Sequence, residues 1–189
     1  MNTPSPFPRA FHTTALALGL LLAPFLASAQ LPATPVTGTV GKSDAQARTE
    51  AKNLAKTGQL AAAEEVLAAQ SKFQRGSDHW HYSTGQLLVR LAGDLSREGK
   101  GTESRSLATQ ALQRFEQAAA ATRDNRAKAS FKSAAGYVNE RYLGDTAAAI
   151  ASYRAATEAN PNDKAAKENL TRLESSYALL RARVPANKR

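Results

Sequence analysis

The chain has 189 residues and a formal net charge of +9, from 25 lysines and arginines against 16 aspartates and glutamates. It contains no cysteine, which excludes disulfide bonds and lipid attachment through a cysteine. Basic and acidic residues are interspersed, as on solvated helix faces, and no basic motif with interleaved aromatic residues argues for a nucleic-acid partner. The length is sufficient for one domain with a sizeable core.

Residues 1–29 have the organisation of a secretory signal peptide. Arg9 supplies the positive charge, residues 15–26 form the apolar segment, and Ala27-Ser28-Ala29 matches a small-residue cleavage site. The apolar run contains Pro24 and is shorter than the ~20 residues that a membrane-spanning helix needs; an uncleaved anchor is the alternative. We therefore expect cleavage after Ala29, a periplasmic or secreted protein, and membrane contact only through the signal peptide during export.

Residues 30–43 are rich in proline, glycine and threonine, a composition that predicts a flexible lead-in. Gly41-Lys42-Ser43 has the form of the end of a phosphate-binding loop. That motif also requires a strand ahead of it and a glycine where this chain has Val36, so we attribute the match to chance. At the other end of the chain, residues 184–189 form a short basic tail.

The helical pattern begins at Asp44. It predicts one helix over residues 44–57 and a second over residues 60–71, joined at Gly58-Gln59. Ala51 and Leu54 are expected to face inward from the first helix. Ala63 and Leu67 follow Gly58 at the same spacing at which Ala149 and Tyr153 follow Gly144.

Three longer helices are expected in the middle of the chain, over residues 78–98, 102–122 and 124–143. Ser77-Asp78 can cap the first of them, and Gly99-Lys100-Gly101 separates it from the second. Their expected apolar faces comprise Trp80, Leu87, Leu88, Leu91, Leu95, Leu107, Ala108, Ala111, Leu112, Phe115, Phe131, Ala134, Ala135 and Val138.

The stretch from Gly144 to Asp163 reads as a turn, a helix and a second turn. Gly144 can adopt the left-handed conformation that ends one helix, and Asp145 can cap the amides of the next. Pro161 cannot continue that helix. Within it, one face is shared by Ala149, Tyr153 and Ala156, which are spaced four and three residues apart.

A last helix is expected over residues 163–183, with Leu170 and Leu173 on one side. It would cover the exposed end of the helices before it.

The order of residues from Gly144 to Pro161 resembles the second half of a tetratricopeptide repeat: Gly-Asp, an alanine, an aromatic residue, another alanine and a closing proline. Asn169-Leu170 also matches the family pattern. Residues 44–71 resemble the repeat more loosely, and the two long helices of the middle depart from it. The resemblance implies an all-α fold over residues 44–183. We expect a right-handed solenoid of about seven helices, with three hairpins and a C-terminal capping helix.

No motif argues for catalysis. A Gly-x-Ser-x-Gly nucleophile motif and a His-Glu-x-x-His zinc motif are both missing, so we expect no enzyme activity and no cofactor or metal. His79 and His81 would lie roughly 200° apart on a helix, which prevents them from binding one metal ion. The cluster from His79 to Tyr82 is either a packed helix start or an aromatic patch for a ligand.

In the tetratricopeptide family, the first helix of each pair lines a concave surface that binds peptides or extended protein segments. The resemblance implies a groove here, and an acidic partner segment would suit its charge, with salt-sensitive binding. A solvated basic face is the alternative. The residues carried over to this groove are Arg48, Lys52, Lys56, His81, Tyr82, Lys132 and Asn139.

The sequence thus predicts a non-catalytic scaffold module of the cell envelope that holds a protein or peptide partner. Two alternatives stay open. The chain is a structural helical protein that self-associates through its long middle helices, or it is a ligand carrier or enzyme that uses the cluster from His79 to Tyr82.

Overall fold

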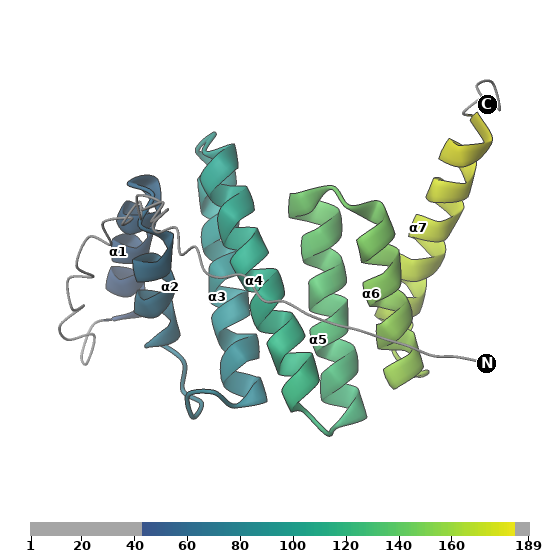
Figure 1. Ribbon diagram of the computed structural model, residues 1–189, viewed down its shortest axis with the longest axis horizontal. Helices are drawn as coiled ribbons and strands as arrows, with labels where there is room; N and C mark the ends of the chain where they lie inside the picture. The colour runs from purple at the N-terminus through teal and green to yellow at the C-terminus, as the bar shows by residue number, and fades with distance from the viewer. Residues whose placement is uncertain (1–42, 184–189) are drawn as a thin grey trace, which may run out of the picture. The chain divides into compact units, whose positions relative to one another are not determined.

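The computed structural model describes residues 43–183, and it is all-helical over that range, with no strand (Figure 1). Nothing in this range has both the length and the apolar character that a helix needs to span a bilayer. The predicted signal peptide, the lead-in up to residue 42 and the basic tail lie outside the described residues. The elements are α1 (Asp44–Lys56), α2 (Leu60–Ala68), α3 (Asp78–Arg97), α4 (Gly101–Ala121), α5 (Asn125–Val138), a π-helix η1 (Asn139–Leu143), α6 (Thr146–Ala159) and α7 (Lys164–Arg183).

The all-α class and the seven helices are confirmed within residues 43–183, and two bounds differ from the prediction by more than one residue. Helix α2 ends at Ala68 rather than at residue 71. The helix predicted over residues 124–143 is α-helical only to Val138 and finishes as the π-helix.

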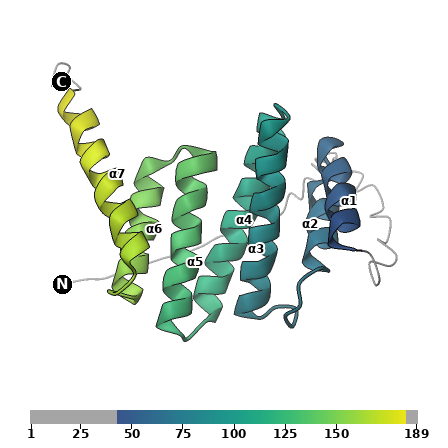
Figure 2. The same ribbon diagram turned by 180° about the vertical axis from the view of Figure 1, so that it is seen from behind.

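Each helix packs mainly against the next one along the chain, from α1 on α2 to α6 on α7. Both views show the successive helices lying side by side in sequence order (Figures 1 and 2). Helix α1 also contacts α3, and η1 contacts α4 and α6.

Short polar side chains cap the starts of α1, α3 and α6. Ser43 forms a reciprocal capping box with Gln46 at the start of α1. The Ser77 hydroxyl accepts a hydrogen bond from the Trp80 amide at 3.1 Å. Asp145 caps α6, accepting from the amide of Ala148 at 2.9 Å.

The core is built from small residues on some helices and large ones on others. Helix α1 buries only alanines, whereas α3 and α4 bury leucines and Phe115. On α6 the predicted face is confirmed, since Ala149, Tyr153 and Ala156 are all buried. The Tyr153 ring lies against the backbone at Gly136, where a β-carbon would come within 2.9 Å of the ring. A glycine is therefore needed on α5 for the two helices to approach this closely.

The π-helix forms the junction between α5 and Gly144. The amides of Gly144 and Asp145 both donate to the Asn139 carbonyl, the latter at 2.9 Å, which closes a wider turn than an α-helix does. Gly144 then ends the element with a φ of 70°, in the left-handed region expected from the sequence. With this turn in place, α6 packs on α5.

Candidate partner-binding surface

The three cations predicted on α1 lie on one stripe, and that stripe faces acidic residues of α3. Arg48 donates to Asp94 through Nε at 2.8 Å and also through Nη2. Lys56 Nζ lies 2.7 Å from Glu98 Oε2, and Lys52 pairs with the other oxygen of the same carboxylate. Arg97 of α3 also pairs with Asp94. We call these six residues, Arg48, Lys52, Lys56, Asp94, Arg97 and Glu98, the α1–α3 seam.

The seam changes what the predicted basic stripe can do. Four cations share two carboxylates, so half of the positive charge of the seam is already neutralised within the chain. The hydrogen bonds from Lys52 and then Lys56 hold the pKa of Glu98 below its ordinary value. Lys52 and Lys56 therefore join two helices, and only the Arg48 end of the seam borders a pocket.

His81 and Tyr82 belong to the packing between helices. The Tyr82 ring lies between Phe115 of α4 and Phe131 of α5, with ring centroids 5.6 and 4.7 Å away. Nδ1 of His81 lies 3.3 Å from Nη1 of Arg114 on α4. Burial, and next the charge of Arg114, lowers the pKa of His81, which favours the neutral ring.

Trp80 completes the aromatic cluster that the sequence singles out. It is 5% exposed, and the guanidinium groups of Arg75 and Arg114 lie over its ring at 5.5 and 4.9 Å. Arg114 also pairs with Glu64 of α2. The cluster thus ties α2, α3 and α4 together, and the packed interpretation accounts for Trp80, His81 and Tyr82.

Lys132 of α5 and Asn139 of η1 lie in a different place, on the side that faces α4 and α6. Lys132 pairs with Glu116, and the amide of Asn139 lies 3.4 Å from the Ser152 hydroxyl. Both residues line a cavity of about 580 Å³. The seven predicted residues are therefore divided among the seam, the aromatic cluster and this cavity.

Beside Arg48 is a pocket of about 430 Å³ between α1, α3 and the C-terminal end of α2 with the loop after it, which we call the basic pocket. Leu67 and Leu87 contribute apolar surface, and Phe73 contributes a ring that is 49% exposed. Lys72 and Arg90 are exposed, and neither has an ion-pair partner within the described range. The remaining residues that line it are Asp44, Ala45, Arg48, Gln70 and Ser83.

A second pocket of about 250 Å³ shares Arg90 with the first and lies toward α5. It is lined by Val89, by the ring of Phe115 and by Tyr137, which is 47% exposed. We call it the tyrosine pocket. Its remaining lining residues are Gln86 and Ala134. The two pockets meet at Arg90 and together follow α1, α3 and α5, which are the first helices of the three predicted pairs.

Sequence reasoning found Arg48 at this surface but not Lys72, Arg90 or Tyr137. Lys72 was missed because the sequence predicts a helix up to residue 71, whereas α2 ends at Ala68 and Lys72 lies in the loop that follows. The sequence does contain one signal for Arg90, because it lies three and seven residues after Leu87 and Ser83 and so shares their side of α3.

The described residues include no group of three or more histidine, aspartate or glutamate side chains that could hold a metal ion. No protein-family model, curated protein or solved structure matches the chain. The tetratricopeptide resemblance accordingly stays a prediction.

Proposed function

We propose that the protein is a non-catalytic scaffold module of the cell envelope that binds an extended, acidic segment of a partner protein. The segment would lie across the basic pocket and the tyrosine pocket. In this proposal the helices form a right-handed solenoid of tetratricopeptide-like hairpins with α7 as the cap. The observation that carries the proposal concerns two exposed cations of the basic pocket, Lys72 and Arg90. They lie beside its apolar side chains and have no ion-pair partner in the described part of the chain.

The chemistry of the two pockets favours a segment that combines acidic and apolar side chains. An apolar side chain can be buried against Leu67 and Leu87, while a carboxylate beside it pairs with Lys72 or Arg90. A second apolar or aromatic side chain fits against Val89 and the Tyr137 ring. Exposed ion pairs alone are worth little, so the apolar contacts would supply most of the affinity and the charges would supply selectivity.

The seam supports placing the partner at Arg90 rather than along the whole of α1. Lys52 and Lys56 already share Glu98, so a carboxylate of a partner would compete with Glu98 for them. Lys72 and Arg90 require no such exchange.

The test is selection of short random peptides on the purified protein, followed by binding measurements on variants. We expect enrichment of peptides with acidic residues flanked by apolar or aromatic ones, and weaker binding at higher salt. Lys72→Glu with Arg90→Glu should reduce affinity at least tenfold. Arg105→Glu with Lys167→Glu makes the same charge change at exposed positions on α4 and α7 and should bind like the native protein.

Equal binding by both double variants, after circular dichroism has shown equal helix content, would remove this surface from the proposal. Selection of peptides without acidic residues would contradict the expected partner chemistry. Export is a separate part of the proposal, and it requires that N-terminal sequencing of the exported protein begin at Gln30.

A further inference from the structure

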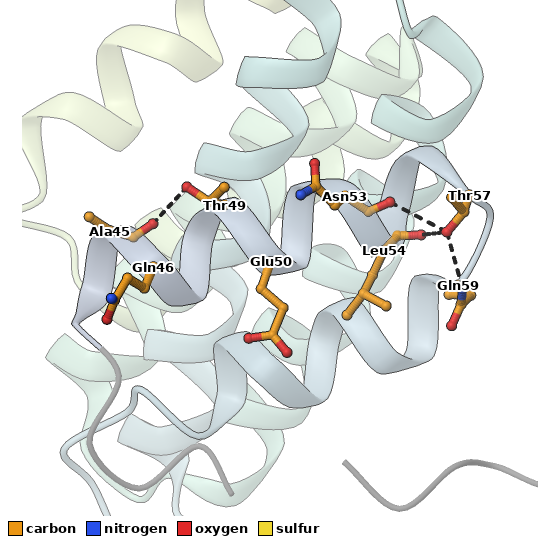
Figure 3. A pocket seen from close by; sticks show the side chains of 8 residues that line it. All are labelled: Ala45, Gln46, Thr49, Glu50, Asn53, Leu54, Thr57 and Gln59. Atoms are coloured by element: carbon orange, nitrogen blue, oxygen red, sulfur yellow. Dashed lines mark hydrogen bonds between the residues drawn. The ribbon is translucent and has the colours of Figure 1, made fainter. Parts of the chain in front are cut away.

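Two pockets of the described helices differ in whether their buried polar groups have partners. The first, of about 680 Å³, is lined by one side of α1 and the turn after it (Figure 3). The hydroxyls of Thr49 and Thr57 donate to carbonyls within α1 at 2.9 Å, as the dashed lines of Figure 3 show. Leu54 packs against the core, and Asn53 is exposed, so solvent can satisfy its amide. This pocket therefore gives no indication of a ligand.

The second is the cavity of about 580 Å³ that Lys132 and Asn139 line, which we call the asparagine cavity. Its walls come from α4, α5, η1 and α6. Two of its polar side chains are buried, since Asn139 is 5% exposed and Ser152 is 9% exposed. Nδ2 of Asn139 lies 3.4 Å from the Ser152 hydroxyl, whereas Oδ1 accepts no hydrogen bond within residues 43–183. A buried amide is normally satisfied at both ends, so this oxygen has a free position for a ligand donor.

The π-helix brings a carboxylate beside this amide. The backbone amide of Asp145 donates to the Asn139 carbonyl at 2.9 Å, so the two residues are adjacent across the π-turn. Oδ1 of Asp145 caps α6 through the Ala148 amide, and its carboxylate forms no ion pair in the described part of the chain. Asp145 and Ser152 are seven residues apart and so share one side of α6. Single π-helical turns of this kind occur frequently at functional sites.

The charge of the asparagine cavity is opposite to that of the whole chain. Glu116 and Lys132 pair with each other. Lys132 precedes Asn139 by seven residues, or about 10 Å along α5, so this pair lies away from Asp145. One lysine against two carboxylates gives the lining a net charge of −1, in a chain whose formal charge is +9. A ligand with one positive charge matches this balance, whereas an anion would be repelled by Asp145.

We propose that the asparagine cavity binds a small primary amine that carries hydroxyl groups, such as an amino sugar. The ammonium pairs with Asp145 and donates to Oδ1 of Asn139. A hydroxyl group, which both donates and accepts, pairs with Ser152. The carbon skeleton lies against Leu143 and Ala148. The volume is within the usual range for small-molecule sites. This site is independent of the proposed partner surface, because it shares no residue with the basic pocket or the tyrosine pocket.

The test is a nuclear magnetic resonance titration of the nitrogen-15-labelled full chain with three six-membered rings, at a slightly acidic pH. Glucosamine carries both the amine and the hydroxyls, cyclohexylamine carries only the amine, and glucose carries only hydroxyls. We expect glucosamine to shift the side-chain amide resonances of Asn139 and the backbone amides of Asp145 and Ser152. It should bind at least tenfold more tightly than either of the other two compounds, because each of them lacks one of the proposed contacts.

Two matched variants assign the binding to this cavity. Asp145→Asn removes the charge and keeps the cap of α6, since asparagine caps helices as well as aspartate does, and should weaken glucosamine binding at least tenfold. Asp163→Asn makes the same change at α7, where Asp163 accepts from the Ala166 amide at 3.0 Å, and should bind like the native chain. Equal affinity in the two variants, or no shift at Asn139 with glucosamine, would overturn the proposal. Equal affinity for cyclohexylamine would overturn the roles given to Asn139 and Ser152.

Discussion

At the scale of single residues, small side chains determine how closely the helices approach one another. Ala47, Ala51 and Ala55 are completely buried on α1, and each adds little volume between that helix and its neighbours. Gly136 has the same effect on α5, where it leaves room for the ring of Tyr153. A large apolar residue in one helix is therefore matched by a small one in the next, as close packing requires.

The contact at Gly136 leads to a first prediction. Gly136→Ala places a β-carbon 2.9 Å from the Tyr153 ring, and we expect it to destabilise the protein by about 1–3 kcal/mol because neither helix can move freely. Gly101→Ala is the matched control, since a β-carbon there meets nothing within 4 Å. That variant should be neutral or stabilising by up to about 1 kcal/mol. Urea unfolding of both variants checks this, and an equal loss in both would contradict the steric explanation.

At the scale of elements, the attachment of α1 depends on charge as well as on burial. The face that α1 buries consists of alanines. The ion pairs of the α1–α3 seam add a second attachment, because they join the cations of α1 to Asp94 and Glu98 at the end of α3. The spacing of the seam is regular, because residues four apart on α1 meet residues four apart on α3. This arrangement fixes the register of the two helices as well as joining them.

The seam gives a second prediction, for the titration of Glu98. Its pKa in the folded protein is lowered, first by the hydrogen bond from Lys52 and then by that from Lys56. The carboxylate therefore stabilises the fold above its unfolded pKa, and this contribution is lost as the pH falls through the folded pKa. Nuclear magnetic resonance should show a Glu98 midpoint below 4.5, which is the ordinary value.

Replacing both lysines provides the control for this titration. In Lys52→Gln with Lys56→Gln, the midpoint of Glu98 should rise toward 4.5. An unchanged midpoint would mean that the two lysines do not hold the carboxylate in solution.

The elements themselves could be predicted from the sequence because their signals are local. Ser77, Asp145 and Gly144 act within a few residues of their own positions, and the helices begin and end close to where these residues indicate. The π-helix was not predicted, since the sequence pattern indicates a continuous helix up to residue 143 and the wider turn depends on how α6 packs against α5. The pairing of Arg48 with Asp94 could not be predicted, because it joins residues 46 positions apart on different helices.

The residues of the candidate surface were predicted only where a local sequence pattern indicates them. Arg48 was found because it belongs to a visible stripe of cations. Lys72 and Arg90 come together only when the end of α2 is placed beside α3, which a single-sequence pattern does not specify. The prediction also grouped Lys132 with Arg48 because both lie on first helices, although the two side chains meet different neighbours.

At the scale of the whole molecule, stability is distributed mainly between neighbouring helices. Each helix contacts chiefly the next one in sequence, so the two ends have fewer partners than the middle. Arrays of this kind open from their ends at lower free energy than they unfold as a whole. We therefore expect hydrogen exchange to be slowest in α3 and α4 and faster in α7.

A third prediction tests this distribution through Leu173, which is 6% exposed and packs with Ile150 and Tyr153. Leu173→Ala should reduce the free energy of local opening of α7 by about 2–4 kcal/mol, because it removes buried volume. The exchange of amides in α3 should be nearly unaffected. Leu179→Ala is the control, since that leucine is 63% exposed. Uniform acceleration throughout the chain would indicate that the helices unfold as one cooperative unit.

The seam has one further consequence, for its tolerance of substitution. Asp94 serves both Arg48 and Arg97, and Glu98 serves both Lys52 and Lys56. After the loss of any one basic residue, each carboxylate still has one ion-pair partner. The loss of one acid instead leaves two like charges facing each other across the junction. We therefore expect substitutions of Asp94 or Glu98 to weaken the contact between α1 and α3 more than substitutions of a single basic residue of the seam. Over evolution, the basic positions should vary more readily than the two acidic ones.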